Sequence, residues 1–173
     1  SLMCFHASRF DARLGQNGDI ILYNDQDTAL WNEELIARGE FYLNKAATGE
    51  RLSKYHLEAG IAYWHTRKID TAEKWENILQ LYNKLLQFEY SSIAALNRTY
   101  ALAKARDKAV AITEAEKLQL TGNHLYYSLL GYLYTDVDRQ KALTYLKTGL
   151  KLAKSKSDKE MMMKHIKKLN ANE

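Results

Sequence analysis

Apolar residues recur along most of this chain at the three- and four-residue spacing of amphipathic helices. The spacing is found near residues 54–67, 75–89, 92–106, 108–119, 124–136, 139–154 and 158–169, where it would give each helix one apolar face and one polar face. Proline is absent and glycine occurs eight times, which favours long helices joined by short turns over sandwiches or barrels. The pattern therefore predicts an all-α protein of antiparallel helical hairpins.

A weak internal repeat of about 34 residues runs through these helices, as in tetratricopeptide (TPR) repeats. The clearest unit starts near Asn123 and places these residues at the characteristic positions of its two helices: Tyr127, Leu130, Gly131, Tyr134, Ala142, Leu146 and Gly149. A second unit aligns Leu96, Tyr100 and Ala109 but has Asn97 in place of the small residue, and a third aligns Ala59, Gly60 and Tyr63 with Ile78, Tyr82 and Leu85. We expect TPR-like hairpins in a right-handed superhelix, with an irregular helical bundle as the alternative.

Residues 1–50 have a different pattern. Asn17-Gly18 lies between Ala12-Arg13-Leu14 and Ile20-Ile21-Leu22 and is a strong signal for a primed hairpin turn, so a small N-terminal β-hairpin is expected. A helix should follow over residues 28–43, with Asp25 or Asp27 as its N-cap. The chain is thus divided into a lead-in segment, 1–50, and a helical repeat body, 51–173, which are expected to form one compact unit.

Composition indicates the cellular compartment and shows how charge is distributed along the chain. The single cysteine, Cys4, fits a reducing compartment, and no apolar run approaches the roughly 18 residues needed to cross a bilayer, so a cytoplasmic protein without membrane contact is expected. The net charge of +4 is uneven, because residues 1–50 carry four basic and eight acidic side chains and residues 141–173 carry nine and three. Lys147, Lys151, Lys154 and Lys164 recur at helical spacing, as on the solvated face of a terminal helix. The alternative is a surface that attracts phosphate backbones.

Candidate catalytic chemistry is sparse. The five histidines have no metal-ligand spacing with a third acidic or cysteine partner. The acidic cluster Asp25, Asp27, Glu33 and Glu34 could supply an acid–base pair, but helix capping and the helix dipole already explain its positions. No glycine-rich phosphate loop or nucleophile elbow is present. We expect no enzyme activity, no cofactor and no metal.

A binding groove is the more natural expectation for stacked hairpins. By repeat register, its candidate lining residues mix aromatic and polar side chains that could hold an extended peptide or a helix of another protein. They are Lys54, Trp64, His65, Arg98, Tyr132 and Asp136.

The first forty residues resemble a known family. The stretches CFHASRFDAR and DQDTALWNEELIARG are similar to the region just after DNA-binding region 4 in those extracytoplasmic-function (ECF) RNA polymerase sigma factors that carry a TPR-like C-terminal extension. The similarity continues through KYHLEAGIAYWHT, LYNKLLQFEYSSIAALNRTYAL and LLGYLYTD. The family usually has proline at the joint occupied here by residues 90–92, and this chain has none there.

This resemblance implies a regulatory extension that acts in transcription initiation by contact with sigma regions 2 and 4 of its parent chain or with RNA polymerase. DNA would be reached only through those sigma regions, which are not in this sequence. We therefore expect an excised C-terminal piece, in which Ser1 is a cloning remnant and residues 2–7 end a helix that continues from region 4. The residues expected to fix the hinge to the sigma core are Arg9, Asp11, Arg13, Asp25, Gln26, Asp27, Trp31 and Asn32.

Alternatives remain at this level. Arg13 and Asp27 could instead tie the hairpin to its own helix. The chain could be a free-standing TPR-like peptide-binding adaptor, or a small-molecule sensor or enzyme with a tyrosine-lined cavity. The sequence predicts no oligomeric state.

Overall fold

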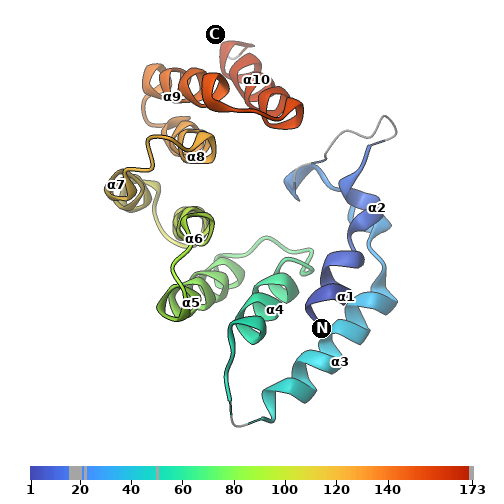
Figure 1. The fold of residues 1–173 in the computed structure, drawn as a ribbon. Coiled ribbons are helices and arrows are strands. Elements are labelled where there is room, and N and C mark those ends of the chain that lie inside the picture. Colours follow the sequence, from blue (N-terminus) through green and yellow to red (C-terminus); the bar gives the residue numbers. More distant parts are fainter. Residues whose placement is uncertain (16–20, 22, 50, 172–173) are drawn as a thin grey trace. The chain divides into compact units, whose positions relative to one another are not determined.

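The computed structural model describes residues 1–15, 21, 23–49 and 51–171, and in these ranges the chain is helical, with no strand (Figure 1). The prediction of an all-α protein is thus confirmed. The helices are α1 (Leu2–Ala7), α2 (Phe10–Arg13), α3 (Glu33–Ala47), α4 (Lys54–Trp64), α5 (Ala72–Phe88), α6 (Ser92–Ala105), α7 (Lys108–Leu118), α8 (His124–Tyr134), α9 (Arg139–Leu152) and α10 (Lys156–Ala171), with short 3-10 helices at Tyr23–Asp25 and Thr28–Leu30. None of these helices is both long enough and apolar enough to cross a membrane.

The chain divides into two compact units, Ser1–Tyr90 and Ser91–Glu173. Unit 1 contains α1 to α5 and unit 2 contains α6 to α10. A boundary after residue 50 was expected from the sequence, whereas α4 and α5 belong with the lead-in segment, because α4 packs on both α1 and α3.

In unit 1, a close helix contact holds the lead-in segment to the helices that follow. A Cβ atom on Gly39 of α3 would lie 2.6 Å from Cε1 of Phe5 in α1, so only glycine lets these two helices approach this closely. The Phe5 ring also packs on Tyr63 of α4, with 5.8 Å between ring centroids. Leu57, Ile78 and Leu79 complete a buried core between α4 and α5.

Unit 2 consists of two helical hairpins and a final helix. The helix α6 packs on α7, α8 packs on α9, and α10 packs on α9. A Cβ atom on Gly131 would lie 2.5 Å from Cγ of Leu146, so the close packing of α8 on α9 also requires glycine at this position. Leu133, Leu146 and Met162 are fully buried and form the centre of this core.

Side-chain caps explain why most of these helices begin where they do. Each helix from α5 to α9 has an N-cap side chain that accepts a hydrogen bond from a backbone N–H in its first turn. The N-caps are Thr71 (α5), Ser91 (α6), Asp107 (α7), Asn123 (α8) and Asp138 (α9). Such a cap satisfies an otherwise unpaired N–H and contributes about 1 kcal/mol.

The expected N-terminal β-hairpin is corrected by the structure at residues 12 and 13, whereas Leu14 has an extended backbone. Ala12 and Arg13 lie in α2, where the fully buried Ala12 packs into unit 1, and tertiary packing of this kind overrides local strand preference. The predicted turn, Asn17-Gly18, lies outside the described residues. One backbone hydrogen bond, from the Ile21 N–H to the Arg13 carbonyl (2.8 Å), joins the two sides of this segment.

The helix expected over residues 28–43 starts later than predicted. Asp27 caps only the 3-10 helix, by accepting from the Ala29 N–H (2.9 Å), and the chain is extended at Trp31. Asn32 is the N-cap of α3 and accepts from the Leu35 N–H (2.9 Å). The break allows Trp31 to turn into the core, where it is 4% exposed.

Candidate functional site

A cluster of buried cations and aromatic rings lies in unit 1. We call it the cation–aromatic cluster, and it consists of Arg9, Tyr23, Gln26, Trp31, His65 and Lys74. Its members come from the α1–α2 junction, the segment before α3, the end of α4 and the start of α5. They therefore join parts of the sequence that are far apart.

Arg9 connects the start of the lead-in segment to the residues that precede α3. Its side chain is 7% exposed, and its Nε and Nη2 atoms donate to Oε1 of Gln26 at 3.2 and 2.9 Å. The guanidinium also lies 4.7 Å from the ring centroid of Tyr23 and 5.2 Å from that of Trp31, a favourable cation–π arrangement. Burial, and next the charge of Arg13, lowers the pKa of Arg9 to about 10, so Arg9 stays charged at neutral pH.

Lys74 makes the corresponding contact from the first turn of α5. It is only 1% exposed, and its ammonium group donates to the Tyr23 hydroxyl (2.6 Å) and to the Arg67 carbonyl (2.8 Å). Its Nζ atom also lies 5.0 Å from the centre of the Tyr23 ring. Tyr23 thus contacts one cation from α5 and another, Arg9, from the lead-in segment.

His65 occupies the apolar side of the same cluster. Its ring makes edge-to-face contacts with Tyr23 and Trp75, at centroid distances of 5.2 and 5.7 Å. Burial of the ring, followed by the positive charges of Arg9 and Lys74, lowers the pKa of His65 to about 3. Its buried Nδ1 atom has no hydrogen-bond partner among the described residues. The histidine is therefore a neutral aromatic side chain at physiological pH.

The predicted hinge residues fall into two groups. Arg9, Gln26 and Trp31 meet in the cluster, while Asn32 links α1 to α3 by donating its N–H to the Ser8 carbonyl (2.8 Å). Asp11, Asp25 and Asp27 are exposed, and Arg13 lies beside His6, with 3.5 Å between Nη2 and Nδ1. For the alternative in which Arg13 and Asp27 tie the hairpin to its own helix, the structure shows that the Asp27 carboxylate caps the 3-10 helix that follows it.

The predicted groove residues are distributed over both units, and we consider each unit separately. In unit 1, Lys54 starts α4 and pairs with Glu89 (2.7 Å), Trp64 ends α4 and packs on Tyr63, and His65 belongs to the cation–aromatic cluster. These three residues do not form one surface.

In unit 2, two of the predicted groove residues share a neighbour. Lys108 pairs with the Asp136 carboxylate, and its Nζ atom lies 5.3 Å from the ring centroid of Tyr132. Tyr132 packs in turn on Tyr100, with 5.1 Å between ring centroids. Arg98 lies instead 3.9 Å from Glu114 of α7. We call Tyr100, Lys108, Tyr132 and Asp136 the tyrosine surface.

Sequence reasoning missed two members of the cation–aromatic cluster, Tyr23 and Lys74. Tyr23 follows the residues assigned to a strand, and Lys74 has the appearance of an ordinary charge in a first helical turn. A buried lysine has no local sequence signature, so only the fold reveals it.

No group of three or more histidine, cysteine, aspartate or glutamate side chains in the described ranges could hold a metal ion. The cluster contains two cations and a neutral imidazole. These groups can order a segment and position its exposed side chains.

Comparison with known proteins gives two matches. Residues 1–47 match a family of unknown function (DUF6596), which in other proteins sits after sigma-70 regions. An uncharacterized protein of Rhizobium meliloti (strain 1021) is 31% identical over 162 residues, which cover 91% of this chain and 38% of that protein. The chain thus spans less than half of its relative's length. No solved structure matches.

Proposed function

We propose that this chain is a regulatory protein-interaction domain of an ECF-type RNA polymerase sigma factor. It would act in transcription initiation through contact with the sigma core, RNA polymerase or both. The observation that carries the proposal is the match of residues 1–47 to a family that follows sigma-70 regions in other proteins. The greater length of the matching relative is compatible with further domains beside this one.

The geometry supports a rigid attachment. The matched residues end in α3 and are tied by Arg9, Tyr23 and Lys74 to the start of α5. A protein joined to residue 1 would therefore connect to a folded unit rather than to a loose tether. Charge-assisted hydrogen bonds and cation–π contacts of this kind fix orientation as well as adding stability.

The proposal includes a TPR-like arrangement for the helical hairpins. Supporting it, α6 packs on α8 as well as on α7, Tyr100 and Tyr132 pack on each other at one position of these two helices, and Gly131 lets α8 approach α9. Repeats of this type present extended surfaces to other proteins.

Binding to the sigma core tests the proposal. We would measure the affinity of the purified chain for a protein containing the sigma regions 2 and 4 encoded with it, and for core RNA polymerase, and then compare two charge reversals. Asp11→Arg changes an exposed hinge candidate in α2, and Glu73→Arg changes an exposed acid in the first turn of α5 as the matched control.

We expect micromolar or tighter binding that Asp11→Arg weakens at least about tenfold, since a like-charge contact at an interface costs several kcal/mol, while Glu73→Arg changes it less than about twofold. Absence of binding to both partners would refute the proposed function. Equal losses in the two variants would refute the hinge assignment.

A second candidate is a peptide-binding adaptor, which the tyrosine surface of unit 2 favours. Tyrosine rings beside a lysine and a carboxylate can hold an extended peptide by packing and by polar anchoring. Capture of unstructured peptides by the purified chain, with loss on Tyr132→Ala and no affinity for sigma regions, would select this candidate.

A further inference from the structure

The net positive charge of the chain is concentrated at its C-terminal end. Of 25 basic and 21 acidic side chains, nine basic and three acidic lie in residues 141–173, so the first 140 residues carry 16 basic and 18 acidic ones. The excess of +4 therefore comes entirely from α9, α10 and the turn between them.

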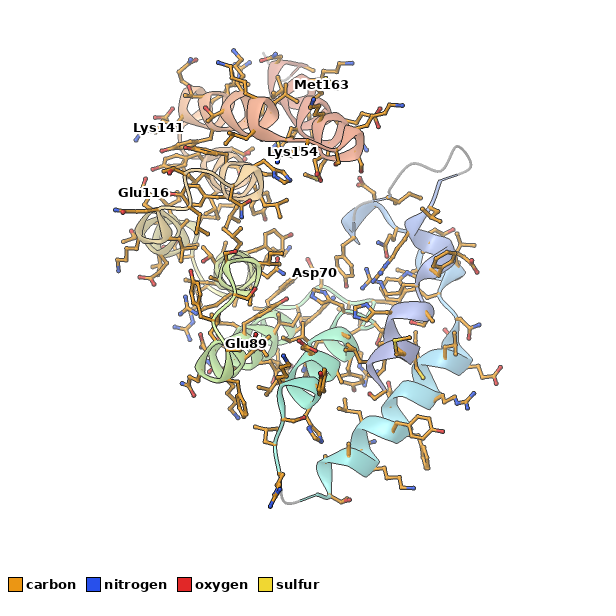
Figure 2. The ribbon with its side chains drawn as sticks, viewed as in Figure 1. Asp70, Glu89, Glu116, Lys141, Lys154 and Met163 are labelled. Carbon is orange, nitrogen blue, oxygen red and sulfur yellow. The ribbon has the colours of Figure 1, made fainter. Side chains whose placement is uncertain are left out.

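The way α10 is attached to unit 2 determines which of its sides faces outward. Met162 and Leu169 are buried, Asp158 bonds His124 of α8 (3.1 Å), and His165 bonds the hydroxyl of Thr135 (3.1 Å). The opposite side of the helix is exposed, and Figure 2 labels Met163 on it. This lysine face consists of Lys156, Lys159, Glu160, Met163, Lys164, Lys167 and Lys168.

Nearly all charged side chains of the lysine face are positive. Glu160 is its only acidic residue and lies 3.5 Å from Lys156, while Asp158 is turned toward His124 and the Ser155 hydroxyl. A face that serves only for solubility normally has both signs interspersed. An array of one sign produces a local potential that attracts a polyanion.

We propose that the lysine face binds the phosphate backbone of duplex DNA without reading its sequence. Protein–protein interfaces are depleted of lysine and enriched in arginine and aromatic residues, whereas no arginine follows Arg139 in this chain. Lysine binds phosphate as a point charge, and neutralisation of phosphates by lysine releases counterions whatever the base sequence. Met163, 41% exposed, is the one large apolar side chain that the described part of this face offers.

Duplex DNA fits better than a single strand for two reasons. Proteins that hold single strands stack bases on exposed aromatic rings, but Tyr145, the aromatic residue of α9 and α10, is half-buried and packs on Tyr127 and Tyr134. Duplex DNA also has the higher charge density, one phosphate per about 1.7 Å of axis. From Lys156 to Lys167 the helix extends about 16 Å, enough for roughly four lysine–phosphate contacts.

Fluorescence anisotropy with a 20-base-pair duplex of arbitrary sequence tests the proposal. The assay contains neither sigma regions nor RNA polymerase, and the inference does not rest on the proposed function, so each can fail without the other. We expect a Kd on the order of 10 μM at 50 mM salt, about 100-fold weaker binding at 200 mM, and a slope of log K against log salt of about −3.6 for four phosphate contacts.

Matched charge reversals locate the site. Lys156→Glu/Lys159→Glu/Lys167→Glu changes the lysine face, and Lys45→Glu/Arg51→Glu/Lys84→Glu changes three exposed residues of unit 1. Both variants take the net charge from +4 to about −2, so a difference between them reports position rather than total charge. We expect the first to bind at least about 30-fold more weakly than the unchanged chain, and the second to stay within about threefold.

The Lys→Gln version of the first variant, with its helicity checked by circular dichroism, preserves the test if the reversal disturbs α10. Failure of the unchanged chain to bind duplex DNA at 50 mM salt would overturn the inference. Equal losses in the two triple variants would overturn it as well, and so would tighter binding of a single strand or of a polyglutamate peptide than of the duplex.

Discussion

At the scale of single residues, Arg9 contacts three side chains of the lead-in segment. It donates twice to Gln26 and lies against the rings of Tyr23 and Trp31. Because Arg9 precedes the segment 10–22 and its three partners follow it, Arg9 holds together parts of the backbone that share no helix. Its role is therefore to order the segment that precedes α3.

Replacing Arg9 by alanine should lower the free energy of unfolding of unit 1 by about 2–4 kcal/mol. The variant loses two charge-assisted hydrogen bonds and two cation–π contacts, and it leaves the side-chain oxygen Oε1 of Gln26 without these donors. All three tryptophans, Trp31, Trp64 and Trp75, lie in unit 1, so urea unfolding followed by tryptophan fluorescence measures this effect. Arg51→Ala, at an exposed site, should change it by less than about 0.5 kcal/mol. An equally small effect of Arg9→Ala would contradict the role given to Arg9.

His65 should make unit 1 sensitive to acid. The histidine of the unfolded chain binds a proton near pH 6.5, whereas burial beside Arg9 and Lys74 lowers the pKa of the folded ring to about 3. The unfolded state therefore binds more protons between these values, so the stability due to the neutral ring is present above about pH 6.5 and is lost as the pH falls toward 3.

His65→Phe removes the titration and keeps the aromatic contacts with Tyr23 and Trp75. We expect the melting temperature of this variant to fall less than that of the unchanged chain between pH 7 and pH 4, as measured by tryptophan fluorescence. Parallel pH profiles for the two proteins would show that other groups cause the acid sensitivity.

The residue scale also marks the limit of what the sequence predicts. Arg9, Gln26 and Trp31 were identified from the family stretches in which they occur, but the contact of Tyr23 with Lys74 joins residues 51 positions apart. Nothing local distinguishes Lys74 from the many exposed lysines, because its burial depends on how α5 meets the lead-in segment. Pairings of this kind become visible only in the fold.

At the scale of helices, the hydrophobic pattern was a good guide. The periodicity predicted helices at 92–106 and 108–119, and the structure has Ser92–Ala105 and Lys108–Leu118. The ends agree because capping residues such as Asp107 act within one turn. The lead-in segment was predicted less well, since Ala12 is drawn into a helical turn by burial.

The repeat register shows a similar limit. The sequence placed Asn97 at the small position that Gly131 occupies, but Asn97 is exposed while Thr99 is 1% exposed. Periodicity identifies the apolar face of α6, but it does not identify which position on that face must be small.

Gly131→Ala tests the close approach of α8 and α9. Alanine is the better helix former by about 1 kcal/mol, yet its Cβ would lie 2.5 Å from the Leu146 side chain, and overpacking of this kind costs about 1–3 kcal/mol. We expect a net loss of stability in unit 2, measured by far-UV circular dichroism during urea unfolding. Gly122→Ala is the matched control, because its Cβ would meet nothing within 4 Å. If both variants were equally stable, the close contact would not limit the packing.

At the scale of the whole molecule, each unit has its own buried core. Phe5, Ile78 and Leu79 serve unit 1, whereas Leu133, Leu146 and Met162 serve unit 2. A change inside one core removes contacts within that unit. We therefore expect a core substitution to lower the stability of the unit that contains it and to leave the stability of the other unit unchanged.

Gly131→Ala and Arg9→Ala allow this independence to be measured. We expect Gly131→Ala to speed amide hydrogen exchange in α8 and α9 while leaving α4 and α5 and the tryptophan fluorescence transition unchanged, because exchange reports the opening of the unit that contains each amide. Arg9→Ala should speed exchange in α4 and α5 and shift the tryptophan fluorescence transition, while leaving exchange in α8 and α9 unchanged. If either variant instead increased exchange equally in both units, the two cores would unfold as one cooperative body. A signal received by one unit could then reach the other through that shared stability.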